Sequence, residues 1–380
     1  MPPPEKTIER CKTWLSDHVF PLWTQSGIST DGDFLEALSL DGEPIDLPRR
    51  AMVQARQIYA FRVGAALGAC PAARARVIVA RAAARLIDRY SLASGAFIHS
   101  LGTDGSPRGK PDLYTQAFAL FGLANAYAVS PDEALKRRAL AVLDYLQRER
   151  RALSAGYTEF EGDELVLRSN PHMHLFEAAL NWMQVDPSSC WSDLAGEILH
   201  LCLGAFIDPD TGALCERFQA EWKPERVDSR FFFEPGHHYE WSWLMTLHQE
   251  LTGSPCPSAG RLFQIAEKAG LNPDGFAWDE VWSHGVPKKR SSRFWPQGER
   301  VKAAVRLGVH APQTEQVAYA RAADQALDAL LRFLETPTPG IWRDTRLESG
   351  VFREEPAKAS SLYHIINAID EYVALRPRLG

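Results

Sequence analysis

The chain has 380 residues, of which 45% are hydrophobic and 24% are charged, and its formal net charge is −6 at pH 7. This composition is typical of a globular protein with enough apolar material for a large core. The charges are spread along the sequence, which leaves no basic face for nucleic acid or an anionic membrane.

The start of the chain and its cysteines favour a reducing compartment. Residues 1–6 lack the apolar core of a secretory signal, and no later segment reaches the roughly 18 consecutive apolar residues of a membrane span. The six cysteines are scattered without a CxxC pair, which favours buried reduced thiols over disulfides or a zinc site. We therefore expect a cytoplasmic protein with no nucleic-acid or membrane partner.

Helical periodicity dominates the chain, and strand-like alternation is scarce. Some helices have clear start signals, as in Ser130-Pro131-Asp132-Glu133, which offers an N-cap, a proline in the first turn and acidic residues. A turn at 208–212 is predicted to lead into a short hairpin over 213–218. The predicted helices span 48–67, 72–90, 113–127, 131–147, 172–182, 191–206, 237–251, 298–308, 314–334 and 357–375.

Polar residues recur within otherwise apolar helix starts. They are Arg56, Asp112, His174, His237, Glu299 and His364. The intervals between successive positions range from 56 residues, between Arg56 and Asp112, to 65 residues, between Glu299 and His364. An interval of about 60 residues accommodates two helices and their loops, so the spacing predicts six helical hairpins.

Six hairpins can form either a closed ring or an open solenoid. A solenoid would spread the six polar residues along a concave surface, and it would need caps at both ends. Six units use up the 380 residues, and closure removes both ends. We therefore predict an all-α fold, an (α/α)6 barrel that forms a single catalytic domain over residues 1–380, with the polar positions converging at one mouth.

The segment Pro235-Gly236-His237-His238-Tyr239-Glu240-Trp241 indicates acid–base chemistry. His237 and Glu240 would lie one helical turn apart on one face, where a carboxylate can orient an imidazole and raise its pKa. Metal binding is not expected, because the histidine pairs 172/174 and 237/238 do not share a helix face and no HExxH motif is present.

Four ordered motifs resemble the N-acylglucosamine 2-epimerase superfamily, over about residues 56–372. They are NPHMHLFEA at 170–178, PGHHYEW at 235–241, RFWPQGE at 293–299 and SLYH at 361–364. The resemblance implies an (α/α)6 barrel, and we expect an enzyme that works without a cofactor or metal. The superfamily contains N-acylglucosamine and cellobiose 2-epimerases, mannose isomerases and sulfoquinovose isomerases.

The resemblance also implies roles for individual residues. His237 and His364 match the acid–base pair, with Glu240 and Glu177 as acidic neighbours, and Arg56 matches an arginine that binds sugar oxygens. His174 would be a third histidine near the sugar. The further residues expected to bind substrate or support the site are Tyr59, Asp112, Tyr114, Trp295, Gln297 and Glu299.

These residue types suit proton transfer at C2 of an open-chain aldose. The C2 hydrogen is weakly acidic, so its removal needs a base and a group that stabilises the enediolate oxygen. A permanently charged arginine suits that oxygen. Return of the proton to C1 gives a ketose, whereas return to the opposite face of C2 gives the epimer.

Loop features favour the mannose-isomerase branch. Trp295 is the single tryptophan before Pro296, as in that branch. The chain is also short for the family. One residue departs from the isomerase pattern, because Gly298 stands where that pattern has a larger residue. The basic segment Lys288-Lys289-Arg290, with Arg293, would either hold an acidic substituent or be a solvated turn.

We therefore predict an isomerase that interconverts D-mannose, or a close analogue, and D-fructose, and that acts on a monosaccharide as a monomer or homodimer. The alternatives within the superfamily are a 2-epimerase of the N-acylglucosamine or cellobiose type and an isomerase of a phosphorylated or sulfonated hexose. Outside it, a non-catalytic binding protein would lack a histidine or the arginine. A glycoside hydrolase would need two carboxylates in the cleft.

Overall fold

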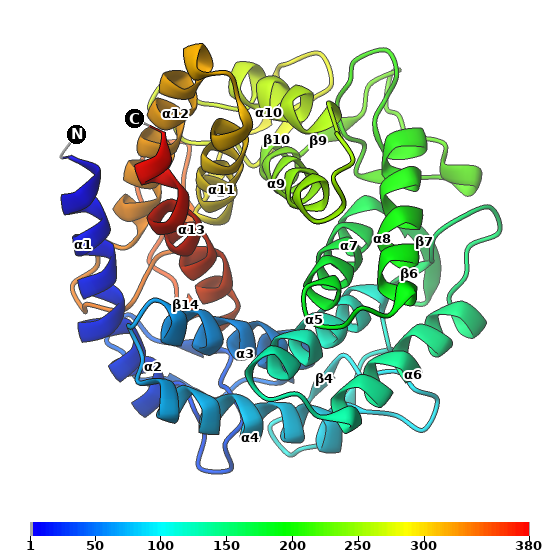
Figure 1. Ribbon diagram of the computed structural model, residues 1–380, viewed down its shortest axis with the longest axis vertical. Helices are drawn as coiled ribbons and strands as arrows, with labels where there is room; N and C mark the ends of the chain where they lie inside the picture. The colour runs from blue at the N-terminus through cyan, green and yellow to red at the C-terminus, as the bar shows by residue number, and fades with distance from the viewer. Residues whose placement is uncertain (1–2, 380) are drawn as a thin grey trace.

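The computed structural model describes residues 3–379 and consists of two concentric rings of helices (Figure 1). Within that range, the inner ring contains α3 (Ala51–Ala66), α5 (Leu113–Val129), α7 (Ser169–Met183), α9 (Pro235–Thr252), α11 (Trp295–His310) and α13 (Leu362–Leu375). The outer ring contains α4 (Ala72–Tyr90), α6 (Glu133–Glu149), α8 (Ser189–Leu201), α10 (Ser258–Ala269) and α12 (Gln313–Phe333), with α1 (Pro4–Trp14) and α2 (Phe20–Gln25).

The ring is closed. Each inner helix packs against the next one in chain order, and α13 packs against α3. Helix α1 packs on the outside of α13, so the first and last α-helices lie on the same side of the ring (Figure 1). The predicted all-α (α/α)6 barrel is therefore confirmed.

The sequences of the helices explain which ring they join. Helix α5 is apolar on nearly every side, and its residues are buried continuously from Thr115 to Ala126, as expected for a helix enclosed on all faces. Helix α4 instead buries one stripe that includes Ala75, Val79 and Leu86, while Arg74, Arg76 and Arg81 are exposed. The inner helices therefore form the core, and the outer helices cover it.

Short antiparallel strands lie in the loops that lead into the inner helices. They form four three-stranded sheets in the orders β14-β1-β2, β3-β4-β5, β6-β7-β8 and β11-β10-β9, and the pair β12-β13. The strands are β1 (Ala37–Leu38), β2 (Pro44–Ile45), β3 (Arg49–Arg50), β4 (Ser100–Leu101), β5 (Pro107–Arg108), β6 (Glu159–Glu161), β7 (Glu164–Arg168), β8 (Arg217–Phe218), β9 (Phe232–Phe233), β10 (Glu280–Trp282), β11 (Pro287–Lys289), β12 (Ser292–Arg293), β13 (Thr345–Arg346) and β14 (Ala357–Lys358).

One contact recurs between these loops and the inner helices. A glutamine or histidine near the start of the helix accepts a hydrogen bond from a backbone N–H of the preceding loop, which satisfies a buried donor. The pairs are Gln54 with Phe34, Gln116 with Phe97, His172 with Tyr157, His238 with Leu214 and Gln297 with Ala277. These contacts fix each loop against the ring.

The structure departs from the predicted helices at several places. Helices α1, α2 and α10 were not predicted, and residues 357–361 form β14 and a 3-10 turn before α13 begins. The predicted hairpin at 213–218 is wrong in its pairing, because Leu214 makes a single bridge to Ile207 while Arg217–Phe218 pairs with β7. Across residues 3–379, none of the helices is both long and apolar enough to cross a membrane.

Candidate active site

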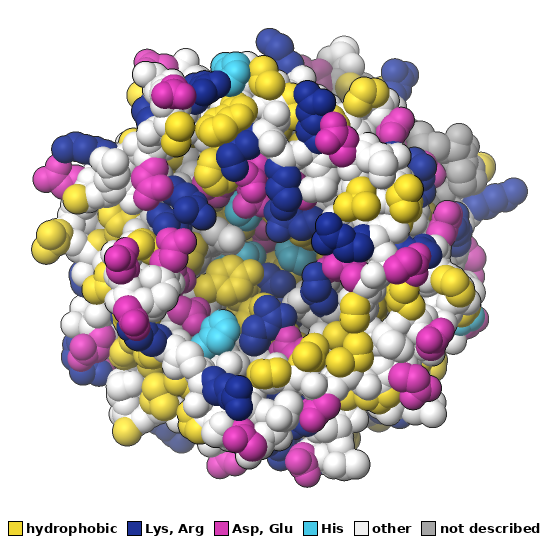
Figure 2. Space-filling model, turned by 180° about the vertical axis from the view of Figure 1, so that it is seen from behind, with side chains coloured by type: hydrophobic (Ala, Val, Ile, Leu, Met, Phe, Trp, Pro, Cys, Tyr) yellow, Lys and Arg dark blue, Asp and Glu magenta, His cyan; other side chains and the backbone are white. Residues whose placement is uncertain are grey.

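A cavity of about 290 Å³ lies where the inner helices begin. Its wall includes Arg56, His174, His237, Glu240 and His364, which come from α3, α7, α9 and α13. Figure 2 shows this face hollowed near its centre, with histidines and basic side chains around the hollow. A wider cavity of about 800 Å³ adjoins it and shares His237 in its wall. Of the six recurring polar residues, Arg56, His174, His237 and His364 thus meet in this cavity, Asp112 lies in the wall of the wider one, and Glu299 contacts His364 without lining either.

His237 lies in the first turn of α9 and contacts a carboxylate from a loop. Its Nδ1 is 2.9 Å from Oε2 of Glu216, which also accepts hydrogen bonds from the hydroxyl of Ser169 and, through Oε1, from the backbone N–H of Glu234. Burial alone would lower the pKa of His237, but the charges of Glu216 and Glu234 raise it to about 9. His237 is therefore charged at neutral pH and can act as an acid.

His364 lies in the first turn of α13 and also contacts a carboxylate. Its Nδ1 is 2.8 Å from Oε1 of Glu299 on α11. Burial, followed by the positive charges of Arg56 and Lys302, lowers the pKa of His364 well below its usual range. His364 is therefore neutral at neutral pH and can act as a base.

Trp295 packs against both imidazoles. Its ring centroid is 5.2 Å from that of His237 and 5.7 Å from that of His364. Gly236 permits this packing, because a Cβ at that position would lie 2.4 Å from the Trp295 ring. Gly298 faces away from the cavity, since a Cβ there would meet the backbone oxygen of His364 at 3.3 Å.

Arg56 brings a positive charge to the cavity wall. Its guanidinium lies over the rings of Phe118 and Tyr363, at 4.2 and 4.9 Å from their centroids. It donates hydrogen bonds to the hydroxyl of Tyr114 and to the backbone oxygen of Ser360. Among residues 3–379, no carboxylate forms an ion pair with Arg56, so its charge is available to an oxygen of a bound molecule.

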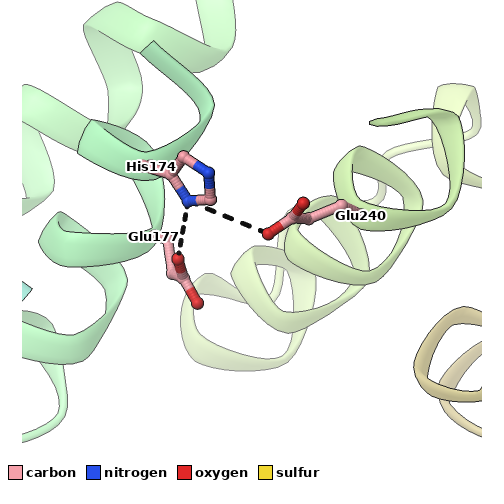
Figure 3. Close-up of side chains that lie close together, drawn as sticks. All are labelled: His174, Glu177 and Glu240. Atoms are coloured by element: carbon pink, nitrogen blue, oxygen red, sulfur yellow. Dashed lines mark hydrogen bonds and ion pairs between the residues drawn. The ribbon is translucent and has the colours of Figure 1, made fainter. Parts of the chain in front are cut away.

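His174 and two carboxylates form a buried cluster between α7 and α9 (Figure 3). His174 Nδ1 is 3.1 Å from Glu177 Oε2 and 3.8 Å from Glu240 Oε1. Burial lowers the pKa of His174 to about 4, despite the Glu177 charge, so this imidazole is neutral. Burial and the nearby Glu299 carboxylate raise the pKa of Glu240 well above its usual range.

Glu240 does not orient His237 as the sequence motif suggested. Its carboxylate lies one helical turn deeper in the ring and faces His174, while Glu216 contacts His237. Glu240 Oε1 has no hydrogen-bond partner within the described part of the chain. The motif therefore places the right residue types in the site but assigns His237 the wrong carboxylate.

Two groups of buried side chains have atoms that could hold a metal ion. They are His174, Glu177 and Glu240, and Glu240, Glu299 and His364, with the ligand atoms of each group within 4.8 Å of one another. Much of this ligand capacity is engaged, because Glu177 also accepts the Tyr363 hydroxyl and Glu299 also contacts Lys302. Catalysis without metal stays a prediction.

Five predicted residues lie outside the inner cavity wall, namely Tyr59, Asp112, Glu177, Gln297 and Glu299. Glu177 and Glu299 contact His174 and His364, which line the cavity. Tyr59 packs on Phe121 and Tyr363, and Gln297 binds the backbone of Ala277 as one of the loop contacts. Asp112 caps the N-terminus of α5 and lies in the wall of the wider cavity. Tyr114 and Trp295 both line the inner cavity.

Every cation of the predicted basic segment has a carboxylate partner. Lys288 pairs with Glu280, Lys289 and Arg293 with Asp279, Arg290 with Glu348, and Arg293 also with Glu234. The side chains of Lys289 and Arg290 are more than half exposed. Carboxylates thus neutralise the segment, which includes β11 and β12, and Arg293 lines the inner cavity.

Two residues at the centre of the site were not predicted. Glu216 follows no helical spacing, because it lies in a loop 21 residues before its partner His237. Lys302 could have been found from its spacing, because it follows Glu299 by one helical turn on the same face.

Comparisons with known proteins agree on the family. Residues 32–368 match the family described as N-acylglucosamine 2-epimerase (GlcNAc 2-epimerase). The chain is 38% identical over 373 residues to a mannose-6-phosphate isomerase of Rhizobium meliloti (strain 1021), and the match covers 94% of each chain.

Solved structures show the same fold at low sequence identity. A cellobiose 2-epimerase from Spirochaeta thermophila DSM 6192 superposes with a TM-score of 0.85 at 20% identity, covering 99% of this chain and 98% of the other. A D-mannose isomerase gives a TM-score of 0.84 at 18% identity, with coverage of 98% and 97%. The chain belongs to the N-acylglucosamine 2-epimerase family of sugar epimerases and isomerases.

Proposed function

We propose that this enzyme is an aldose–ketose isomerase that interconverts D-mannose, or a close analogue, and D-fructose. The observation that carries the proposal is the opposite electrostatic setting of two imidazoles on one cavity. Carboxylates surround His237, while Arg56 and Lys302 lie near His364. Two groups whose surroundings push their pKa values apart are suited to serve as acid and base.

His364 is the base in this mechanism. Its Nδ1 faces Glu299, so the proton resides there and the lone pair of Nε2 is free to accept the C2 proton. As the C2–H bond breaks, electron density moves onto the C1 oxygen, and Arg56 stabilises this enediolate oxygen. The O2 hydroxyl passes its proton to the O1 oxyanion, and the charged His364 returns its proton to C1 as the carbonyl forms at C2.

His237 is the acid that opens the sugar ring. As a charged imidazolium held by Glu216, it donates a proton to the ring oxygen as the bond from C1 to that oxygen breaks, the anomeric hydroxyl loses its proton to water to form the C1 aldehyde, and His237 recovers its proton on closure. His237 and His364 come from different helices, α9 and α13, and both contact the Trp295 ring. The acid and the base therefore serve different steps, and His237 acts first when the substrate is a closed ring.

Isomerisation is preferred to 2-epimerisation, although both share the first proton transfer. The curated relative named as a mannose-6-phosphate isomerase supports this choice, because it is similar over nearly the whole chain. The single tryptophan before Pro296 also supports it. We further propose that residues 1–380 form one catalytic domain that acts in the cytoplasm as a monomer or homodimer, which fits six free cysteines.

The same reaction on a hexose 6-phosphate is the second candidate, and the name of that relative favours it. Arg50, Arg293 and Lys358 line the mouth, but each pairs with a carboxylate, through Glu36, Glu234 and Asp344. In the described residues, the wider cavity has more carboxylates than cations. Its carboxylates are Asp112, Glu159, Asp163, Glu216, Glu234 and Glu280, and its lysines and arginines are Lys110, Arg168 and Arg217. An uncharged hexose therefore fits better.

Proton NMR in heavy water tests the proposal. The enzyme is incubated separately with D-mannose and with D-mannose 6-phosphate. Deuterated fructose from mannose supports the proposal, and deuterated fructose 6-phosphate with no reaction of mannose supports the second candidate. Glucose or its 6-phosphate as the sole product would overturn isomerisation in favour of epimerisation.

A further inference from the structure

Lys302 is a fully buried cation next to the proposed base. It lies on α11 one helical turn after Glu299, and its side chain has 0% exposure. Its Nζ is 2.6 Å from Glu299 Oε2, while Glu299 Oε1 is 2.8 Å from His364 Nδ1. The Glu299 carboxylate therefore bridges an ammonium and an imidazole.

The ammonium of Lys302 lies among aromatic side chains and has few other partners. Its Nζ lies 3.7 Å from the ring centroid of Trp243 and 5.9 Å from that of Tyr363. In residues 3–379, Glu299 is the carboxylate with which it forms an ion pair. Burying an ammonium is costly, and an apolar side chain of similar length would fill this space at less cost. The presence of a positive charge, rather than an apolar side chain, at position 302 therefore needs an explanation.

The two histidines of the cavity provide a comparison within one protein. Both are buried, and both place Nδ1 within 3 Å of a carboxylate, Glu216 for His237 and Glu299 for His364. The carboxylates around His237 raise its pKa to about 9, yet the pKa of His364 is lowered. Lys302 contacts the partner of His364, whereas the ion pair of Glu216 is with His237 itself.

Other charged and titratable groups also face His364 from the helices packed around it. They are Arg56 on α3, His174 and Glu177 on α7, Glu240 on α9, and Glu299 and Lys302 on α11. Arg56 disfavours a charged imidazole as Lys302 does, but it does not contact Glu299. Lys302 is therefore the cation placed to offset the charge of Glu299.

We propose that Lys302 is a positioning residue that balances the Glu299 charge, so that the Glu299–His364 pair keeps a single proton on Nδ1 and a free lone pair on Nε2. This inference rests on the proposed function, because it takes His364 to be the base. It extends that function by assigning the protonation state of the base to a residue that does not touch the cavity.

Loss of the Lys302 ammonium places a hydrogen on Nε2 of His364, whichever of the two groups, Glu299 or His364, holds the added proton. Without Lys302, the carboxylate and the imidazole take up a further proton as a coupled pair. If the proton adds to the imidazole, Nε2 carries a hydrogen. If it resides on Glu299, the carboxyl donates to Nδ1, and the hydrogen again moves to Nε2. In both forms His364 cannot accept the C2 proton.

The pH dependence of kcat/KM of Lys302→Met tests this inference. The acid limb, where the base gains its proton, is expected to move up by about 1–3 pH units, as for loss of a charge at this distance. Lys302→Arg keeps the positive charge, so its acid limb is expected at the same pH as that of the wild type. The double variant Lys302→Met/Glu299→Gln removes both charges, and its limb is expected to return toward that of the wild type.

Arg300→Met is the matched control. Arg300 is also buried on α11 and pairs with Glu267, away from the cavity, so its loss removes a buried ion pair without a change near His364. Circular dichroism shows which variants are folded, and Lys302→Gln replaces the methionine variant if that variant unfolds. If a folded Lys302→Met or Lys302→Gln enzyme had its acid limb at the same pH as the wild type, the inference would be overturned.

A substrate-free measurement separates this inference from the proposed function. The imidazole signals of the protein are followed by NMR against pH, and that of His364 is identified by its loss in His364→Ala. Lys302→Met is expected to raise the pH at which this signal titrates, and an unchanged titration would refute the inference. An active His364→Ala enzyme would instead refute the proposed function, whatever the titration shows.

Discussion

Replacing Glu216 by glutamine is expected to lower the upper pH limit of activity. The charge of Glu216 is the first of those that raise the pKa of His237, and that pKa is about 9. Loss of one carboxylate in contact with an imidazole shifts its pKa by about 1–3 units. With a shift of about 2 units, the charged fraction of His237 at pH 8 falls from about nine-tenths to about one-tenth.

The assay is the pH profile of kcat/KM with the ring form of the sugar. In the wild type the basic limb is expected near pH 9, where His237 loses its proton. In Glu216→Gln it is expected near pH 7, with a tenfold loss of kcat/KM at pH 8 and little change at pH 6. The acid limb, which reports His364, should stay in place.

Glu225→Gln is the matched control. Glu225 follows β8 in the same segment and pairs with Arg168 rather than with His237. Its replacement removes one carboxylate from the segment, and we expect no shift of either limb. If Glu216→Gln retained a basic limb near pH 9, the assignment of His237 as the charged acid would be wrong.

The same pKa has a consequence for stability. Because the folded-state pKa of His237 lies above its ordinary value of 6.5, its proton stabilises the folded state below about pH 6.5, and that stabilisation is lost as the pH rises through about 9. A difference of about 2.5 units corresponds to about 3 kcal/mol. Urea unfolding of Glu216→Gln at pH 6 and pH 9.5 should show a smaller loss between the two pH values than the wild type.

Three other changes test the rest of the site. Arg56→Met should lower kcat by about 100-fold or more with a smaller change in KM, because its charge acts on the enediolate; an effect confined to KM would contradict that role. Gly236→Ala should destabilise the protein by about 1–3 kcal/mol in thermal or urea unfolding, because its Cβ would overlap the Trp295 ring, and a neutral result would show that the ring has room to move. Dialysis against EDTA should leave turnover unchanged, and loss of activity that returns with a divalent metal would assign the His174 cluster to an ion.

Much of the ring could be predicted because its signal is periodic. A polar residue at the start of each apolar inner helix gives an interval that two helices fill, and the recurrence fixes the number of hairpins. Helix α10 was missed although Ala259, Leu262 and Ala266 have helical spacing and are buried, since the run is short and contains Gly260. Helix α1 was missed because Cys11 is the buried residue among mostly polar neighbours.

The partners of the catalytic histidines show where a sequence motif stops being informative. His237 and Glu240 share a helix face, but Glu240 lies one turn further along α9, where its carboxylate faces His174 rather than His237. The carboxylate that contacts His237 is Glu216, whose position depends on how its loop folds against α7 and α9. No spacing along the chain encodes that contact.

The two histidines are the same side chain, so their different roles must come from neighbours, and those neighbours are of two kinds. The partner of His237 is Glu216, which comes from a loop at the mouth and lines the wider cavity. The partner of His364 is Glu299, which is packed inside the ring with Lys302 and faces Glu240, and a change of charge there leaves an uncompensated buried ion. In this architecture the acid can therefore be retuned through a loop, whereas the base depends on the core of the barrel. The groups that transfer the C2 proton can then remain unchanged while the loops at the mouth adapt to a given sugar.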